Sequence, residues 1–379
     1  MKNLLILGAG TGGTMMANHL SKKLNAKEWR ITIVDKETTH YYQPGFLFLP
    51  FDIYQPKHVY KDITPFIPKG VELIQQPIDR IDKDADEVLL KDGRRLAYDL
   101  LIIATGTDIA PDEIEGMLGD HWHKDVFDFY SFEGASNLRK KLQTWEGGKL
   151  VVHICEMPIK CPVAPLEFAF LADSFFKNKG MRDKVDITYV TPLDGAFTKP
   201  TAAKELAYLL QQKNIKIVPN FAIERVDGAA KKIVDYGEKE VEYDLLVTVP
   251  TNMGDPMIER SGIGDDMRFV PTDKNTLQSK VKDNIFVIGD ATNLPTSKAG
   301  SVAHFEAEIL TDNILRYIKG EELDAEFDGH ANCFIETGNG KALLIDFNYD
   351  QEPVEGHFPA AVGMPLLKES RLNHLGKLM

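Results

Sequence analysis

The feature that most constrains the fold is a glycine-rich turn near the N-terminus. A continuously apolar segment at residues 4–7 predicts a buried parallel strand. It is followed by Gly8-Ala-Gly-Thr-Gly-Gly13 and by an apolar-periodic segment, residues 15–24, that is typical of a helix. A second predicted strand at residues 30–34 ends in Asp35. This order is the fingerprint of a dinucleotide-binding βαβ unit, in which glycines let the backbone approach a pyrophosphate and the acid binds a ribose. The predicted cofactor-binding residues in this unit are Gly8, Gly10, Gly13 and Asp35.

Two later segments fit a flavin domain. Residues 98–106 predict a buried strand that ends in a turn of small residues, Ala104-Thr105-Gly106. Residues 284–292 predict another strand, which ends in Gly289 and Asp290, and this acid can accept a hydrogen bond from a ribityl hydroxyl. One FAD would therefore be held by three separated pieces of chain.

Two further residues are assigned to the cofactor. Lys298 would supply a cation that stabilises an anionic reduced flavin near its pyrimidine edge, and the alternative is a solvated surface lysine. Pro44 lies in an aromatic loop at residues 41–48, which is a candidate for an apolar slot beside the flavin.

The second predicted nucleotide-binding unit lacks glycine where one is needed. A strand at residues 149–154 leads into the loop 155–164, which contains no glycine, and a helix and another strand follow. Pro158 and Pro162 also remove backbone donors from this loop. We therefore expect no nicotinamide dinucleotide here, and a redox thiol, Cys161, in its place.

The position of Cys161 favours a reactive thiol. It lies just before a helix that starts with proline, where the helix dipole and free N–H groups favour the thiolate, which is the attacking species. The alternative is a small buried hydrophobic residue. Cys155 is either a second sulfur acceptor or simply the buried end of a strand.

The order of these elements predicts an α/β protein with two Rossmann-like nucleotide-binding domains and a small C-terminal α+β cap. The FAD-binding domain is discontinuous, and the second domain, inserted into it, carries the redox cysteine. The predicted bounds are 1–110 and 241–320 for the FAD-binding domain, 111–240 for the inserted domain and 321–379 for the cap.

Composition and termini restrict the partners and the location. The net charge of -13 argues against nucleic acid, and no apolar stretch reaches the ~20 residues that span a bilayer. Because Met1 and the next two residues run straight into a predicted strand, we expect no signal peptide and a cytoplasmic location. Three cysteines in such a chain indicate catalytic or metal-binding thiols rather than a disulfide framework, and we assign no metal site.

The combined pattern resembles sulfide:quinone oxidoreductases over nearly the whole chain. The resemblance rests on the glycine fingerprint, the second domain without its glycine motif and the cysteine at the start of that domain's helix. It also rests on Cys333 and on the run Pro295-Thr-Ser-Lys-Ala-Gly-Ser-Val-Ala-His-Phe-Glu-Ala307. The related flavocytochrome c sulfide dehydrogenases share the cysteine pair but are exported with a haem partner.

The resemblance implies that Cys161 and Cys333 form a redox pair, that sulfide attacks this pair, and that electrons pass through FAD to a membrane quinone. It also implies an acid near the thiols, and Glu167 matches this acid. Alternatively, the Glu167 carboxylate only complements the helix dipole. Many members carry another cysteine between residues 125 and 135, where this chain has Phe127-Asp-Phe-Tyr130.

The C-terminal segment from Pro365 predicts a short amphipathic helix. Its apolar face and the cations around that face are Leu372, Leu375 and Met379, with Lys368, Arg371 and Lys377. Such a helix suits the surface of a membrane and would give peripheral contact with a lipid-soluble quinone. The alternative is a helix docked on its own subunit or on a neighbour's in a homo-oligomer.

Two other functions remain open at this point. A type II NADH:quinone dehydrogenase shares the flavin domain and the quinone, but it needs the second glycine loop that this sequence lacks. A soluble flavoprotein could instead bind sulfane sulfur and pass it to a partner without reducing a quinone. The electron acceptor discriminates between these functions.

Overall fold

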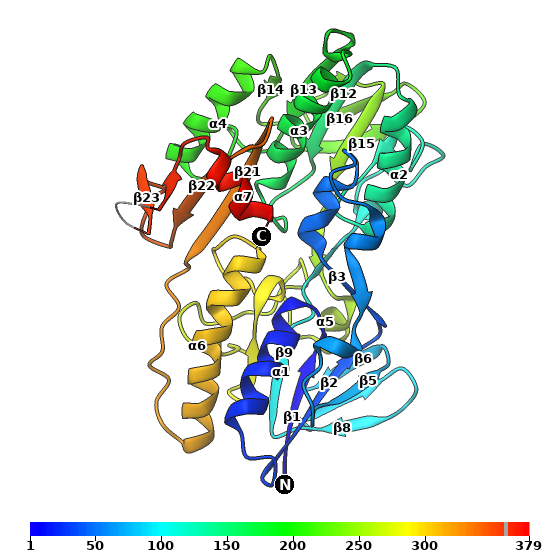
Figure 1. Cartoon of the computed structure of the whole chain (residues 1–379). Coiled ribbons are helices and arrows are strands. Elements are labelled where there is room, and N and C mark those ends of the chain that lie inside the picture. The colour runs from blue at the N-terminus through cyan, green and yellow to red at the C-terminus, as the bar shows by residue number, and fades with distance from the viewer. Residues whose placement is uncertain (360–362, 379) are drawn as a thin grey trace. The chain divides into compact units, whose positions relative to one another are not determined.

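The computed structural model describes residues 1–359 and 363–378, and the chain divides into two compact units (Figure 1). Unit 1 comprises Met1–Tyr41, Tyr60–Asp108 and Met253–Ala331. Unit 2 comprises Tyr42–Val59, Ile109–Asn252 and Asn332–Met379. Two short strands lie where the chain passes from one unit to the other, β10 (Thr107–Ile109) and β19 (Asn252–Gly254).

Unit 1 is built on a parallel sheet. Its strands, in order across the sheet, are β20 (Ile285–Val287), β9 (Leu100–Ile103), β1 (Lys2–Leu7), β2 (Trp29–Asp35) and β5 (Glu72–Gln75). The apolar strands are buried, and α1 (Thr11–Lys23) packs against β1 and β2 and against α6 (Gly300–Lys319). The glycine loop leaves the central strand β1 and enters α1, so it lies at the carboxyl end of the sheet.

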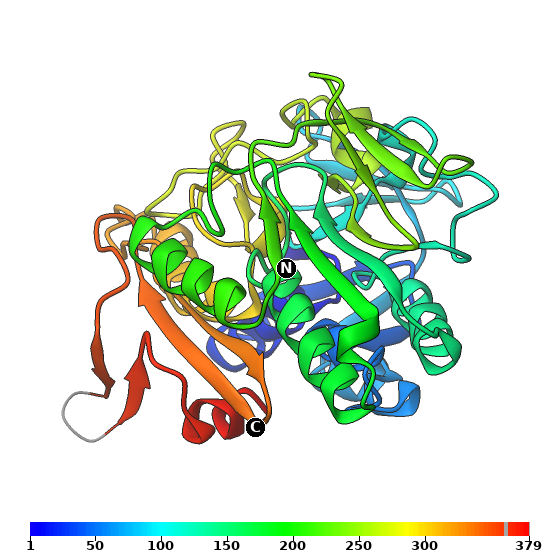
Figure 2. The same cartoon turned by 90° about the horizontal axis from the view of Figure 1, so that it is seen from above.

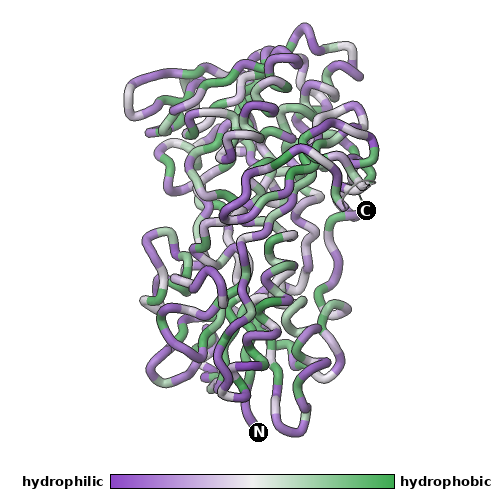
Figure 3. The backbone as a smooth tube through the Cα atoms, turned by 90° about the vertical axis from the view of Figure 1, so that its left-hand side faces the viewer, coloured by the Kyte–Doolittle hydropathy of each residue, from purple (hydrophilic) through white to green (hydrophobic). Residues whose placement is uncertain are grey.

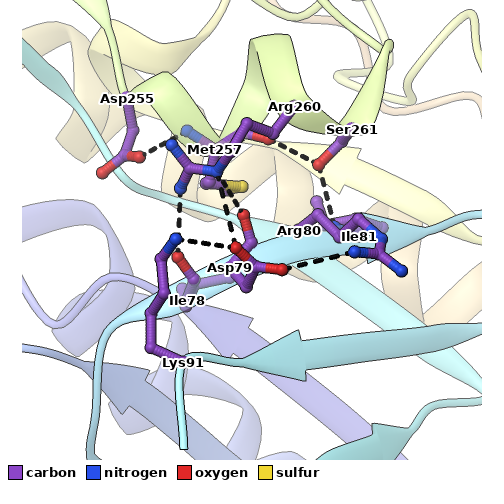
Figure 4. Close-up of polar contacts among 9 residues, drawn as sticks. All are labelled: Ile78, Asp79, Arg80, Ile81, Lys91, Asp255, Met257, Arg260 and Ser261. Atoms are coloured by element: carbon purple, nitrogen blue, oxygen red, sulfur yellow. Dashed lines mark hydrogen bonds and ion pairs between the residues drawn. The ribbon is translucent and has the colours of Figure 1, made fainter. Parts of the chain in front are cut away.

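Unit 1 also contains antiparallel strands and a short helix. These are β3 (Thr39–Tyr41), β4 (Tyr60–Asp62), β6 (Ile78–Asp82), β7 (Glu87–Leu90), β8 (Arg95–Ala97) and α5 (Pro256–Ser261). Figure 4 shows the hydrogen bonds and ion pairs that connect α5 with β6. The Ser261 hydroxyl accepts a hydrogen bond from the buried Ile81 N–H at 2.8 Å and donates to the Met257 carbonyl. Arg260 Nε donates to the Asp79 carbonyl at 2.8 Å.

We predict that Ser261→Ala lowers the free energy of unfolding by about 1–3 kcal/mol, because it leaves the buried Ile81 N–H without its acceptor. Urea denaturation measures this. The matched control is Ser21→Ala, whose hydroxyl donates only within its own helix, to Asn18, and which should change stability by less than about 0.5 kcal/mol. Equal effects of the two substitutions would contradict the role of Ser261.

Unit 2 contains a second parallel sheet. Its strands, in order, are β11 (Val126–Phe127), β18 (Leu245–Val249), β12 (Gly148–Ile154), β13 (Val185–Val190) and β14 (Lys216–Val218). The other elements of this region are the helices α2 (Phe132–Thr144), α3 (Ala164–Asn178) and α4 (Pro200–Gln212), and the antiparallel strands β15 (Ile223–Asp227), β16 (Lys232–Asp235) and β17 (Glu240–Glu242). Helix α3 packs on β12 and β13 and is buried along most of its length.

The C-terminal part of the chain belongs to the same unit. It consists of β21 (Ala331–Gly338), β22 (Lys341–Phe347), β23 (Gly356–Phe358), β24 (Met364–Leu366) and α7 (Arg371–Leu378). Figures 1 and 2 both show α7 lying along the hairpin that β21 and β22 form. The fully buried Asn373 fixes the start of α7, because its amide donates to the Pro365 and Lys368 carbonyls.

The two parallel sheets confirm the predicted α/β class, and in Figure 3 the hydrophobic segments lie inside each unit, with hydrophilic turns on its outside. The compact units group the chain differently from the predicted domains, since residues 42–59 and 332–379 pack with residues 109–252. Aromatic packing is one physical reason: the ring of Phe51 lies 4.9 Å from that of Phe168 on α3. The polar contacts of α7, described below, are another.

Candidate active site

The glycine loop of unit 1 has the geometry of a pyrophosphate site. Gly8 has a φ of +96°, and a side chain there would lie 2.5 Å from the Ala104 carbonyl oxygen, while a side chain on Gly13 would collide with the Gly8 carbonyl. Gly10 caps α1 without any side-chain hydrogen bond, and a side chain there would meet nothing within 4 Å. Asp35 Oδ2 accepts the Ala9 N–H at 2.6 Å, so the predicted ribose-binding acid is bonded directly to this loop.

The Gly289–Asp290 turn of unit 1 bonds to two buried charged side chains, Glu306 and Lys298. Gly289 has a φ of +72°, and its N–H donates to Glu306 Oε2 at 2.6 Å. Lys298 is 6% exposed and donates to the carbonyls of Asp290, at 2.8 Å, and Thr292, at 2.6 Å. Lys298 is therefore not a surface lysine. Burial lowers the pKa of Lys298 and the nearby carboxylates raise it, and the net shift is downward.

Glu306 is a residue that sequence reasoning missed. Burial raises its pKa to about 8, and its Oε1 is buried with no partner among the described residues. The hydroxyl of Thr105, in the predicted small-residue turn, is likewise buried and unpartnered within the described chain. Orphaned polar atoms in and beside the predicted cofactor-binding segments fit the polar FAD, which this chain binds. Pro44 lies in unit 2, so its predicted contact with the cofactor stays a prediction.

In unit 2, side chains rather than glycines shape the loop that carries Cys161. Cys161 has a φ of +47°, and its carbonyl accepts hydrogen bonds from the Tyr130 hydroxyl at 3.1 Å and from the Ala164 N–H at 2.9 Å. The preceding Lys160 N–H donates to the fully buried Asn252 at 3.0 Å. Hydrogen bonds therefore hold the peptide that follows Cys161 and the one that precedes Lys160, and Cys161 itself has a left-handed conformation that costs a non-glycine residue about 1–3 kcal/mol.

The structure brings the two predicted redox cysteines close enough to interact. Cys161 is half-buried, Cys333 lies on β21 and is 8% exposed, and neither is in a disulfide. The pKa of the Cys333 thiol is raised, first by burial and then by the neighbouring Cys161, whereas Lys377 lowers it. Of the two, Cys161 is the more accessible to a small nucleophile or electrophile.

A buried ion pair lies beside these thiols. Glu167, in the first turn of α3, is fully buried, and its Oε1 accepts the Lys377 ammonium at 2.7 Å and the Glu336 N–H at 2.8 Å. The Lys377 ammonium also donates to the Phe334 carbonyl at 2.9 Å. Burial alone lowers the pKa of Lys377, but Glu167 and both cysteines raise it more, and the net shift is upward. Glu167 Oε2 has no partner among the described residues.

Lys377 corrects part of the prediction for the tail. We expected it among the cations around an apolar helical face, but its side chain is only 14% exposed because it pairs with Glu167. Leu372 and Leu375 are exposed, as the amphipathic pattern predicts, at 51% and 57%. Met379 lies outside the described residues. No local signal in the sequence marks Lys377, since its partner is 210 positions away.

Cys155 is not part of this cluster. It is 3% exposed and lies at the end of β12, where its sulfur is 3.5 Å from the Thr248 hydroxyl and 3.8 Å from His153 Nδ1. Burial raises the pKa of Cys155 to about 12 and lowers that of His153 to about 3, so both are neutral near pH 7. The interpretation of Cys155 as a buried strand end is therefore favoured over a second sulfur acceptor.

An intact dinucleotide loop in unit 1 and a second parallel sheet in unit 2, whose corresponding loop has no glycine, define a flavoprotein of the disulfide-oxidoreductase class. Residues 2–155 match the family Pyridine nucleotide-disulphide oxidoreductase. The chain is 30% identical over 356 residues to the mitochondrial sulfide:quinone oxidoreductase of Dictyostelium discoideum, which covers 92% of this chain and 78% of that protein. The mouse enzyme of the same name is 28% identical, over 93% of this chain and 79% of its own.

A solved structure agrees in fold. The sulfide:quinone oxidoreductase of Aquifex aeolicus has a TM-score of 0.83 and 22% identity, and covers 100% of this chain and 89% of that one. The protein therefore belongs to the sulfide:quinone oxidoreductase family.

We predict that Tyr130→Phe keeps the fold and the FAD but lowers sulfide-dependent quinone reduction several-fold, because the Cys161 carbonyl loses a hydrogen bond worth about 0.5–1.5 kcal/mol. The freed loop should also let iodoacetamide label Cys161 faster, which peptide mass mapping measures. Tyr208→Phe, at a side chain 53% exposed, is the control and should change neither rate. Wild-type turnover and labelling in Tyr130→Phe would contradict the assignment.

Proposed function

We propose that this protein oxidises sulfide at the Cys161–Cys333 pair and passes the electrons through FAD to a quinone. The observation that most supports this proposal is that the Glu167–Lys377 ion pair interacts electrostatically with both thiols, while Cys161 lies in the loop where a nucleotide-binding domain would otherwise have its glycines. The relatives reported above carry the name of this activity.

The side chains have distinct proposed roles. When the pair is oxidised, HS⁻ attacks one sulfur, the S–S bond breaks, and the products are a persulfide on one cysteine and a thiolate on the other. The Lys377 ammonium stabilises the thiolate electrostatically, and the unpartnered Glu167 Oε2 accepts the proton. Bound FAD supplies a two-electron acceptor that can pass electrons singly to a quinone. Overall, HS⁻ yields sulfane sulfur, one proton and two electrons.

The main alternative is a nicotinamide-dependent reductase, since a type II NADH:quinone oxidoreductase of Staphylococcus aureus is also similar, at 22% identity. The Cys161 loop argues against it. Residues 155–164 contain no glycine, and the peptides around Cys161 already bond to Tyr130 and Asn252. This loop therefore has no open backbone nest for a second pyrophosphate.

We predict that anaerobic sulfide bleaches the flavin absorbance and that a short-chain ubiquinone restores it, whereas NADH and NADPH do neither. Cys161→Ser and Cys333→Ser should each stay yellow and folded yet lose nearly all turnover, because the two thiols act as a unit. Cys155→Ser, which replaces the buried neutral thiol, is the control and should keep most of the turnover. Rapid bleaching by NADH would refute the proposal, and a sulfide-stable flavin with persulfidated Cys161 would indicate a sulfur carrier instead.

Access to a lipid-soluble quinone requires contact with a membrane. Within residues 1–359 and 363–378, no helix has the length and apolar character to cross a bilayer. Leu372 and Leu375 project from α7 into solvent, and Arg371 beside them is exposed. We propose that this face rests on the membrane surface, and a cytoplasmic location stays a prediction.

We predict that the double variant Leu372→Ser/Leu375→Ser binds anionic liposomes several-fold more weakly and turns over long-chain quinone more slowly, because it removes the apolar area that would enter the interface. Sulfide bleaching should be unchanged. A control, Tyr236→Ser, removes a large aromatic side chain that is 76% exposed elsewhere in unit 2. Unaltered liposome sedimentation of the double variant would place the membrane contact elsewhere.

A further inference from the structure

We propose that Glu336 and His374 form the route by which the proton released in sulfide oxidation leaves the buried thiol site. This inference rests on the proposed function, which requires one proton to depart for every HS⁻ that is oxidised. It assigns a role to a buried carboxylate and a histidine that the sulfur chemistry itself does not use.

The route begins at the edge of β21. The Glu167–Lys377 ion pair bonds to the Glu336 N–H and the Phe334 carbonyl, which point to the same edge of the strand because the residues are two apart. Cys333 and Glu336 are three residues apart, so their side chains lie on opposite faces of β21. The ion pair therefore lies between the thiol face and the Glu336 face.

Glu336 and His374 continue the route outward. The Glu336 side chain is 1% exposed, and its two oxygens lie 2.8 and 3.0 Å from His374 Nδ1. The His374 side chain is 23% exposed, so it connects this buried carboxylate with solvent. His374 and Lys377 are three residues apart on α7 and thus share one helical face, which is turned toward Glu336 and Glu167.

The charges around Glu336 suit a proton carrier. Burial raises the pKa of Glu336, the hydrogen bond and charge of His374 lower it, Glu167 raises it and Lys377 lowers it, and the net shift is upward. A raised pKa brings the carboxyl closer to taking up and releasing a proton near neutral pH. Because Glu167 and Glu336 repel each other when both are ionised, a proton on one carboxyl weakens the hold of the other on a second proton.

The proton balance is simple. The sulfur–hydrogen bond of HS⁻ breaks as the sulfur is oxidised, and the two electrons go to the FAD and then to the quinone. The proton goes to the free Oε2 of Glu167, then to Glu336, and leaves through the His374 imidazole. No additional oxidant or reductant is needed.

The test separates proton transfer from simple anchoring of α7. Glu336→Gln keeps a hydrogen-bond acceptor for His374 but cannot carry a proton, and His374→Ala opens a space at the surface that imidazole can enter. Sulfide is mixed rapidly with the anaerobic holoenzyme across neutral pH, while flavin bleaching and proton release to a pH-indicator dye are followed together. His357→Ala, at an exposed histidine on β23, is the matched control.

In Glu336→Gln and in His374→Ala we expect sulfide to bleach the flavin about tenfold more slowly and the proton to be released later. The pH profile of the bleaching rate should also be displaced. Added imidazole should restore His374→Ala but not Glu336→Gln, and His357→Ala should match the wild type. Wild-type rates and proton release in both variants would overturn the route. The route would also be overturned if His374→Ala bleached slowly and imidazole did not restore it while Glu336→Gln bleached normally. This pattern would mean that His374 only anchors α7. A wild-type protein that sulfide does not bleach would instead refute the proposed function.

Discussion

The buried ion pair between Glu167 and Lys377 is the interaction on which the arrangement of the thiol site depends. It joins the first turn of α3, the edge of β21 and the last turn of α7 in one set of hydrogen bonds. A buried pair of this kind tolerates its desolvation because additional groups satisfy the charges, and loss of one partner typically costs about 3–5 kcal/mol. The helix that follows Cys161 and the strand that carries Cys333 are therefore held together by the charged groups to which we assign roles in the proposed chemistry.

The loop around Cys161 shows how a nucleotide-binding topology can be converted to another use. In unit 1 the loop after the first strand depends on glycines, because a side chain at Gly8 or Gly13 would strike the backbone. In unit 2 the corresponding loop has no glycine, and the hydroxyl of Tyr130 and the amide of Asn252 hold its peptides instead. The backbone of Cys161 has a left-handed conformation, with a φ of +47°.

The two units also use buried charge differently. In unit 1, Lys298 and Glu306 are buried beside the Gly289–Asp290 turn, where the lysine bonds to backbone carbonyls and the glutamate accepts a backbone N–H. These groups stabilise the shape of the turn and add fixed charges near the predicted flavin site. In unit 2 the buried Glu336 carboxylate contacts the partly exposed His374, through which we propose that a proton leaves.

The sequence by itself determined the features that depend on neighbouring residues. The glycine fingerprint from Gly8 to Asp35 and the apolar strands fix the α/β class, because sterics and burial patterns act over a few residues. The glycine-free loop likewise predicts a redox role for Cys161, which stays a prediction. Only the tertiary structure decided that Lys377 is a buried partner of Glu167 rather than a surface cation, and that Tyr130 holds the Cys161 peptide. Whether a lysine is desolvated depends on groups that chain folding brings to it, here from a residue 210 positions away, and no local pattern encodes that contact.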